Sequence, residues 1–118
     1  MVKLIAFDLD GTLTQHKTPL EEQNRRVLDE LRERGFSLLM VGAGQCMRIF
    51  RQMGQYPIDI IGNYGMQYSR YDPSAGTLRP VFDRSVPCDR PETERRVAGL
   101  REKYGFTVFR GESVEFHP

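Results

Sequence analysis

Two aspartates, Asp8 and Asp10, stand one residue apart directly behind an apolar run, Val2 to Phe7. A short run of apolar and β-branched residues that ends in Asp and Gly is typical of a strand buried on both faces. In an open α/β sheet, ligands bind at the carboxyl ends of the strands, and both carboxylates would lie at that end. Two carboxylates placed so closely repel each other unless a cation or protons share the site.

Oxygen ligands of this kind favour a hard cation, and Mg²⁺ fits them best. We therefore predict a magnesium site formed by Asp8 and Asp10. At such a site Asp8 can attack a phosphorus atom as a nucleophile, with Asp10 beside it as general acid and base. The alternative is that both are ordinary polar residues where a strand passes into a turn. The apolar run before them and Gly11-Thr12 after them favour the functional site.

The motif that contains the two aspartates also carries a family resemblance. The run Asp8-Leu9-Asp10-Gly11-Thr12-Leu13-Thr14 resembles the first motif of the haloacid dehalogenase (HAD) superfamily of phosphatases and phosphomutases. The resemblance implies that Asp8 is phosphorylated, that Asp10 is the general acid and base, and that Mg²⁺ binds between them. Within the same motif we predict Leu9, Gly11 and Thr12 as phosphate-binding residues.

Composition limits the class of protein. The 118 residues suffice for a small domain, and the net charge of +1 argues against binding to nucleic acid or a membrane surface through a basic field. No apolar stretch is long enough to span a bilayer, and the sequence begins in a strand without a signal-peptide pattern. Cys46 and Cys88 are too few for a disulfide framework or a zinc site. We expect a cytoplasmic protein whose partner is a small phosphorylated substrate; the oligomeric state stays open.

The elements that must position the aspartates alternate between strand and helix. Thr18, Pro19 and Glu21 predict a helix start with a Thr N-cap, Pro at the first position and a capping box, and Gly35 predicts its end. A strand over Phe36–Val41 follows. The next element is a helix that ends at Gly54 and has on one face Cys46, Ile49, Phe50 and Met53. A further strand spans Ile58–Ile61. This order predicts an α/β fold with a Rossmann-like parallel sheet.

A second glycine-rich turn, Gly42-Ala43-Gly44-Gln45, follows the second strand. It exposes backbone N–H groups that can cradle an anion, so we predict Ala43, Gly44 and Gln45 as phosphate-binding residues. The alternative is a tight turn that needs small residues for packing alone. The turn differs from the HAD pattern. The family's second motif has Ser or Thr at the position of Ala43, followed by Gly and often Arg, where this chain has Gly44 and Gln45. The phosphomannomutase branch implies that backbone N–H groups can replace the missing hydroxyl.

After Gly62 the sequence predicts a hairpin from two segments, 66–71 and 77–82, and then a linker. A helix opened by Pro91 and two strands, 106–109 and 113–116, complete the chain. We divide it into a HAD-like core over 1–84 and the beginning of an α/β cap domain over 85–118. This order is similar to the HAD branch of the Cof-type sugar phosphatases and the phosphomannomutases, in which such a cap (type IIB) follows the third core strand.

In that family a Lys and an acidic loop that completes the magnesium site both follow the cap, whereas this sequence stops at Pro118. We expect a fragment of a longer protein rather than a chain that has lost these residues. Such a fragment would leave an exposed parallel sheet edge and an unfilled core face. The leading hypothesis is a Mg²⁺-dependent phosphohydrolase of a small phosphorylated metabolite, a sugar phosphate, that works through an aspartyl-phosphate at Asp8. A phosphomutase and a non-catalytic binding or regulatory domain remain the alternatives.

Overall fold

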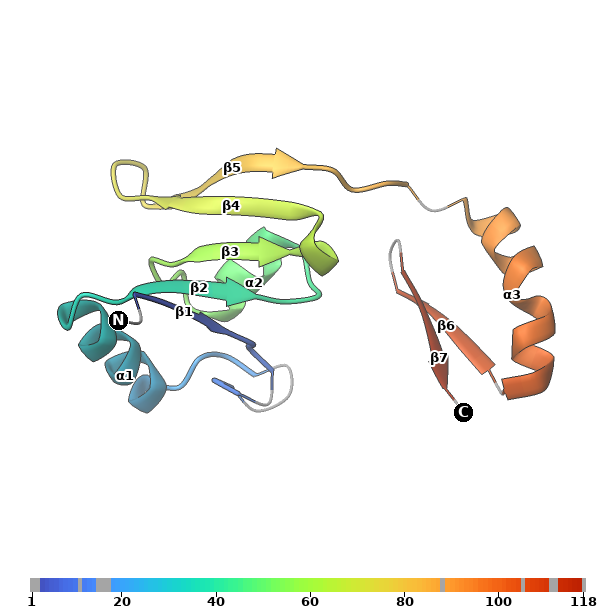
Figure 1. Cartoon of the computed structure of the whole chain (residues 1–118), viewed down its shortest axis with the longest axis horizontal. Helices are drawn as coiled ribbons and strands as arrows, with labels where there is room; N and C mark the ends of the chain where they lie inside the picture. Colours follow the sequence, from blue (N-terminus) through green and yellow to red (C-terminus); the bar gives the residue numbers. More distant parts are fainter. Residues whose placement is uncertain are drawn as a thin grey trace. The chain divides into compact units, whose positions relative to one another are not determined.

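The computed structural model describes residues 3–10, 12–14, 18–87, 89–104, 106–110 and 113–117, in two compact units, Met1–Ser85 and Val86–Pro118. The first unit begins with a strand–helix alternation: β1 (Leu4–Phe7), α1 (Glu22–Glu33), β2 (Ser37–Val41), α2 (Cys46–Gln52) and β3 (Asp59–Gly62) (Figure 1). A short turn, η1 (Asn63–Gly65), then leads into a hairpin made of β4 (Gln67–Asp72) and β5 (Thr77–Asp83).

The five strands form one sheet in the order β1-β2-β3-β4-β5. The first three are parallel, with Leu4 opposite Ser37 and Leu39 opposite Asp59, and the hairpin continues the sheet antiparallel to β3. The predicted α/β fold with a Rossmann-like parallel sheet is therefore confirmed. Because the parallel strands run in one direction, their carboxyl ends lie at the same edge, which is where the two predicted turns follow β1 and β2.

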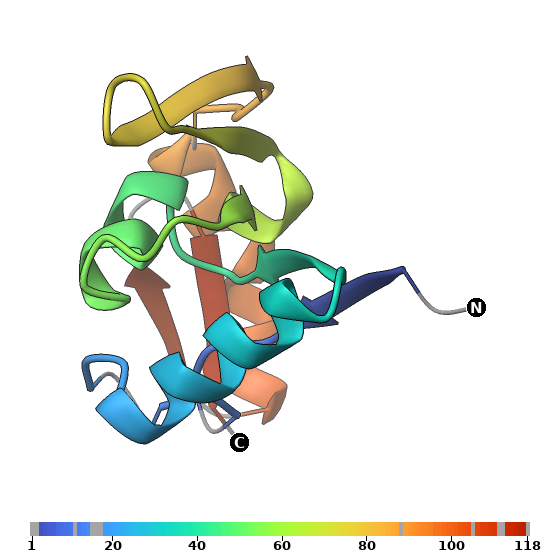
Figure 2. The same ribbon diagram turned by 90° about the vertical axis from the view of Figure 1, so that its left-hand side faces the viewer.

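The core lies on one face of this sheet. Leu28 of α1 and Ile49 of α2 pack in one cluster with Leu38, Met40 and Ile60 of the strands, and all five are at most 8% exposed. A view along the sheet shows both helices on the same side of it (Figure 2). Burying a large aliphatic side chain stabilises a fold by about 1.5–3 kcal/mol, so this cluster fixes α2 and the turn before it to the strands.

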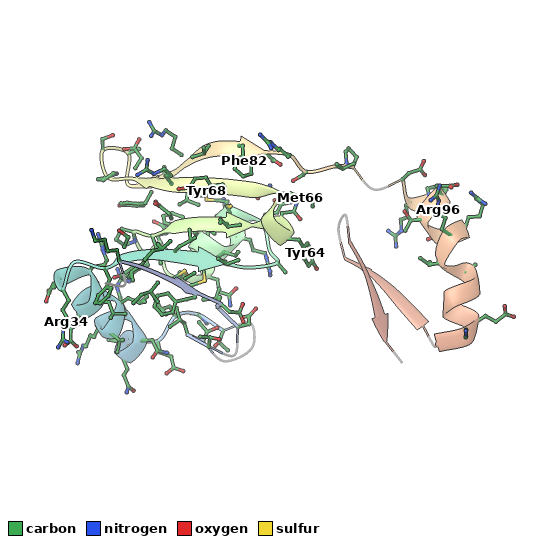
Figure 3. All side chains as sticks on the ribbon, in the orientation of Figure 1. Arg34, Tyr64, Met66, Tyr68, Phe82 and Arg96 are labelled. Carbon is green, nitrogen blue, oxygen red and sulfur yellow. The ribbon has the colours of Figure 1, made fainter. Side chains whose placement is uncertain are left out.

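Within the first unit no described helix covers the other face of the sheet, so the prediction that the first strand is buried on both faces is wrong there. Leu4 is 57% exposed and Val41 is 38% exposed, because α1 and α2 cover only the opposite side. A groove of about 340 Å³ runs over this face; Leu39, Ile61, Tyr68 and Phe82 are among the residues that line it (Figure 3). β1 also forms one edge of the sheet.

Helix α1 starts later than the sequence predicted. Its N-cap is Glu21, which makes no side-chain cap hydrogen bond, whereas Thr18 was expected in this position. The reason is a tertiary contact: the Leu20 N–H donates to the Gln52 carbonyl, and the Thr18 carbonyl accepts a hydrogen bond from the Gln52 side chain. Residues 18–20 are thereby tied to α2 before the helix begins. The predicted helix end is confirmed, since Gly35 has a φ of +90°, which favours glycine.

The second unit consists of α3 (Arg90–Tyr104) and an antiparallel hairpin of β6 (Phe106–Arg110) and β7 (Ser113–His117). These elements match the predicted helix and two strands. Arg95 and Arg96 of α3 are exposed, and both pair with Glu92. The interpretation of this unit as part of a cap stays a prediction. Among the described helices, none is both long and apolar enough to cross a membrane.

Candidate active site

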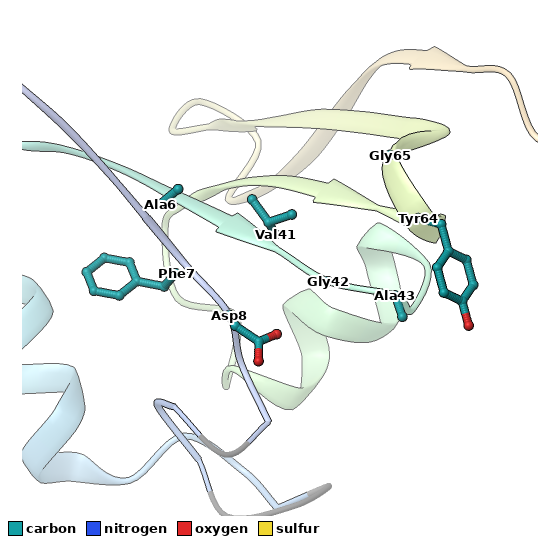
Figure 4. Close-up of a pocket in the computed structure, with 8 residues that line it drawn as sticks. All are labelled: Ala6, Phe7, Asp8, Val41, Gly42, Ala43, Tyr64 and Gly65. Atoms are coloured by element: carbon teal, nitrogen blue, oxygen red, sulfur yellow. The ribbon is translucent and has the colours of Figure 1, made fainter. Parts of the chain in front are cut away.

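A pocket of about 430 Å³ lies at the carboxyl ends of β1 and β2. Ala6, Phe7 and Asp8 line it from the first strand, Val41, Gly42 and Ala43 from the second, and Tyr64 and Gly65 from η1 (Figure 4). The fold therefore brings Asp8 of the first predicted turn and Ala43 of the second to one pocket, although they are 35 positions apart in the sequence.

The Asp8 side chain is available to a ligand. It is exposed, and it makes no hydrogen bond or ion pair with any residue that the structure describes. The close-up shows its carboxylate at the end of β1, beyond the last apolar residue of the strand (Figure 4). A carboxylate that no neighbouring side chain neutralises is suited to binding a cation or to attacking an electrophile.

Asp10 is held by its neighbours instead. Its Oδ1 accepts a hydrogen bond from Gln52 Nε2 at 2.9 Å and one from the Thr14 hydroxyl at 3.4 Å. Thr14 is buried, and Gln52 is half-buried at the end of α2. Two donors from different parts of the chain thus fix the orientation of the Asp10 carboxylate, whereas Asp8, two residues away, is not restrained by any described side chain.

The loop after β1 folds around one carbonyl group. The Leu9 carbonyl accepts the N–H groups of Thr12, Leu13 and Thr14 at 3.2, 3.0 and 3.1 Å. The Leu9 side chain is 3% exposed and belongs to the core, so only its backbone could reach a phosphate. Thr12 is exposed, and its N–H is engaged with Leu9. Gly11 lies outside the described residues, and the phosphate-binding roles of all three stay predictions.

Two hydrogen bonds hold the turn after β2, one to the residue that follows β3 and one to the first residue of β4. The Gly44 carbonyl accepts the Asn63 N–H at 2.7 Å, and the Cys46 N–H donates to Gln67 Oε1 at 3.0 Å. Gly62 is required at this point, because a Cβ built on it would lie 2.6 Å from the Gly44 oxygen. Because the Cys46 N–H donates to Gln67, it is not available to a phosphate. Of the three phosphate-binding residues predicted here, Ala43 lines the pocket, while Gly44 and Gln45 are not among its lining residues.

Cys46 is part of the core. It is 4% exposed, and its Sγ lies 3.4 Å from the Ile60 carbonyl oxygen, to which the thiol donates. Burial raises the pKa of this thiol, which disfavours a reactive thiolate. The predicted placement of Cys46 on one helix face with Ile49, Phe50 and Met53 is confirmed, and that face is buried. Cys88 lies outside the described residues.

Two residues of the site were missed by the sequence reasoning. Gln52 was not singled out, because its contact with Asp10 joins positions 42 residues apart. Tyr64 lines the pocket with 58% of its surface exposed, on a backbone with a φ of +57° that follows Asn63 at +48°. In Asn63-Tyr64-Gly65, the tendency of Asn and Gly to adopt positive φ is the signal that could have marked this segment as a turn at the edge of the site.

The fold and the pocket together define a class: an open α/β sheet with an aspartate pair behind its first strand and a glycine-rich turn behind its second. The sequence pattern of the haloacid dehalogenase-like hydrolase family matches residues 5–61, which include both of these turns. This match covers just under half of the chain, and it confirms the resemblance predicted from the first motif.

Relatives agree with this assignment. Over 66 residues the chain is 36% identical to the HMP-PP phosphatase of Klebsiella pneumoniae (strain 342), a match that covers 53% of this chain and 24% of that protein. A haloacid dehalogenase-like hydrolase from B. subtilis is 26% identical with a TM-score of 0.59, over 96% of this chain and 38% of the other. A HAD phosphatase from Bacteroides thetaiotaomicron shares the fold at 16% identity and a TM-score of 0.56, over 97% of this chain and 41% of the other. The chain thus spans well under half the length of these relatives.

Proposed function

We propose that this chain belongs to a Mg²⁺-dependent phosphohydrolase that acts on a small phosphorylated metabolite, a sugar phosphate, through an aspartyl-phosphate at Asp8. One observation carries the proposal: the Asp8 carboxylate, without a described partner, lines a pocket between the carboxyl ends of two parallel strands. The match of residues 5–61 to the family and the phosphatase among the similar proteins support the same reaction class.

The residues at the pocket suit Mg²⁺. This ion binds through one or two carboxylates and keeps several waters or phosphate oxygens as its other ligands. Asp8 lines the pocket, and Asp10, which is not among the lining residues, follows it by two positions; both supply hard oxygen donors after β1. When bound, the ion would neutralise charge on the phosphoryl oxygens.

The proposed chemistry has two steps. In the first, an Asp8 carboxylate oxygen bonds to phosphorus, the bond from phosphorus to the ester oxygen breaks, and Asp10 gives the leaving oxygen a proton. In the second, water attacks phosphorus, Asp10 takes a proton from that water, and Asp8 leaves as a carboxylate. Gln52 and Thr14 are positioning residues in this scheme, because they orient the Asp10 carboxylate. The second structural unit, α3 with its hairpin, would be part of the cap that selects the substrate.

Metal dependence tests the proposal directly. We expect the complete protein that contains this chain to release inorganic phosphate from p-nitrophenyl phosphate in Mg²⁺, and a chelator to abolish that release until Mg²⁺ is restored. The physical reason is that the donors at Asp8 and Asp10 bind a hard cation that offsets phosphate charge. Phosphate binding without any release of product, with Mg²⁺ present, would instead indicate a non-catalytic binding domain.

Ala43→Ser tests the contact made by the second turn. Ala43 is exposed in the pocket, so a hydroxyl added there can donate to a bound phosphate analogue. A hydrogen bond to a charged group contributes about 1.5–3 kcal/mol, and a tenfold change in affinity corresponds to about 1.4 kcal/mol. We therefore expect the inhibition constant for vanadate to be about tenfold or more lower in Ala43→Ser than in the unmodified protein.

The control for this substitution is Ala75→Ser, which adds the same hydroxyl in the exposed turn between β4 and β5. Weaker inhibition of Ala43→Ser, and still weaker inhibition of Ala43→Thr, would show that the position must be small because substrate or another part of the protein occupies the space. Equal inhibition of all variants would mean that Ala43 does not face the phosphate.

A further inference from the structure

Arg48 lies in α2, one helical turn before Gln52. Residues four apart occupy the same face of a helix, and their side chains lean toward its N-terminus. The Gln52 contacts with the Asp10 carboxylate and the Thr18 carbonyl, both at 2.9 Å, fix this face against the aspartate loop. Arg48 therefore extends from that face toward the turn that follows β2.

The Arg48 guanidinium contacts the backbone of that turn. A Cβ built on Gly44 would lie 2.8 Å from Arg48 Nε and 2.9 Å from Cζ, so the absence of a side chain at Gly44 leaves the space that the guanidinium fills. Ala43, the adjacent residue, lines the pocket together with Asp8. The guanidinium thus contacts the residue that directly follows Ala43 in the chain.

The charge of Arg48 is uncompensated within the described part of the chain. Arg26 and Arg34 pair with Glu22 and Glu30 on α1, whereas Arg48 has no ion pair, hydrogen bond or aromatic ring contact with a described residue. An arginine presents a planar fork of donors that matches a phosphate in two-point contact. A cation of this kind beside a pocket is suited to an anionic ligand.

We propose that Arg48 binds a second phosphate of the substrate, next to the phosphate that is hydrolysed; this inference rests on the proposed function. Arg48 is not among the residues that line the pocket with Asp8, so the group being transferred would occupy the pocket and its anionic neighbour would lie over Ala43 and Gly44. The substrate class is then a metabolite with two phosphates close together, as in a diphosphate.

The test is titration calorimetry of the 118-residue chain with inorganic phosphate and with inorganic pyrophosphate, in a buffer without divalent cations because these bind pyrophosphate. We expect the unmodified chain to bind pyrophosphate more tightly than phosphate. Arg48→Gln should weaken pyrophosphate binding about tenfold or more, since charge-assisted hydrogen bonds are lost, and should change phosphate binding less than about twofold. Arg48→Lys should fall between, because it keeps the charge but loses the fork.

Arg51→Gln is the matched control: it removes the same charge from an exposed position three residues further along α2, and neither affinity should change. Equal loss of both ligands in Arg48→Gln, or no preference for pyrophosphate in the unmodified chain, would overturn the inference. Pyrophosphate preference that depends on Arg48, in a protein that hydrolyses no phosphate ester, would refute the proposed function and leave the Arg48 site standing.

Discussion

In the complete protein, Asp8→Asn is expected to reduce phosphate release to the background rate while leaving the fold intact. An amide has nearly the size and shape of a carboxylate but lacks the negative oxygen that attacks phosphorus, so no aspartyl-phosphate can form. The fold should survive because the Asp8 side chain is exposed and makes no hydrogen bond with a described residue. Steady-state turnover of p-nitrophenyl phosphate, together with the thermal midpoint by circular dichroism, measures both expectations.

Glu33→Gln is the control for Asp8→Asn, because it makes the same carboxylate-to-amide change at an exposed position at the end of α1. It should leave both turnover and the thermal midpoint unchanged. If Asp8→Asn kept turnover close to that of the unmodified protein, Asp8 could not be the nucleophile, and the assignment of the first motif would be wrong.

Asp10→Asn is expected to lower turnover by about 10²–10⁴-fold, the usual cost of losing a general acid or base. The loop should keep its conformation, because the amide oxygen of Asn can still accept the hydrogen bonds that Gln52 and Thr14 donate to Asp10. Metal affinity should fall less than in Asp8→Asn. In HAD enzymes, which this motif resembles, the second aspartate gives its backbone carbonyl to the metal and uses its side chain for proton transfer.

Calorimetric titration of both variants with Mg²⁺ separates these roles. Equal losses of Mg²⁺ affinity would contradict the division between a metal-binding Asp8 and a proton-transferring Asp10. Turnover of Asp10→Asn within a few-fold of the unmodified protein would show that another group, or solvent, carries the proton.

The strand–helix alternation could be predicted from the sequence because local signals agree with the tertiary structure. The face formed by Cys46, Ile49, Phe50 and Met53 is the buried face of α2. Glycines such as Gly35 mark the helix ends, and apolar runs mark β1, β2 and β3. The placement of Asp8 in a pocket also follows from local pattern, because a turn behind a parallel strand opens at the carboxyl edge of the sheet.

Long-range contacts could not be predicted in the same way. The start of α1 moved because Leu20 and Thr18 are bonded to Gln52, more than 30 positions away. The same glutamine holds Asp10, and nothing in its sequence neighbourhood indicates that role. The exposed face of β1 could not be predicted either, because a short apolar strand has the same sequence pattern whether one face or both faces are covered.

Trapping the phosphorylated residue tests the proposed mechanism most directly. The protein is mixed with p-nitrophenyl phosphate and Mg²⁺, quenched in acid and treated with borohydride, which reduces an aspartyl-phosphate to homoserine, and its peptides are read by mass spectrometry. We expect homoserine at Asp8, and none in Asp8→Asn. Phosphate release by a protein that shows homoserine at another aspartate, or at none, would contradict the assignment of Asp8 as the nucleophile.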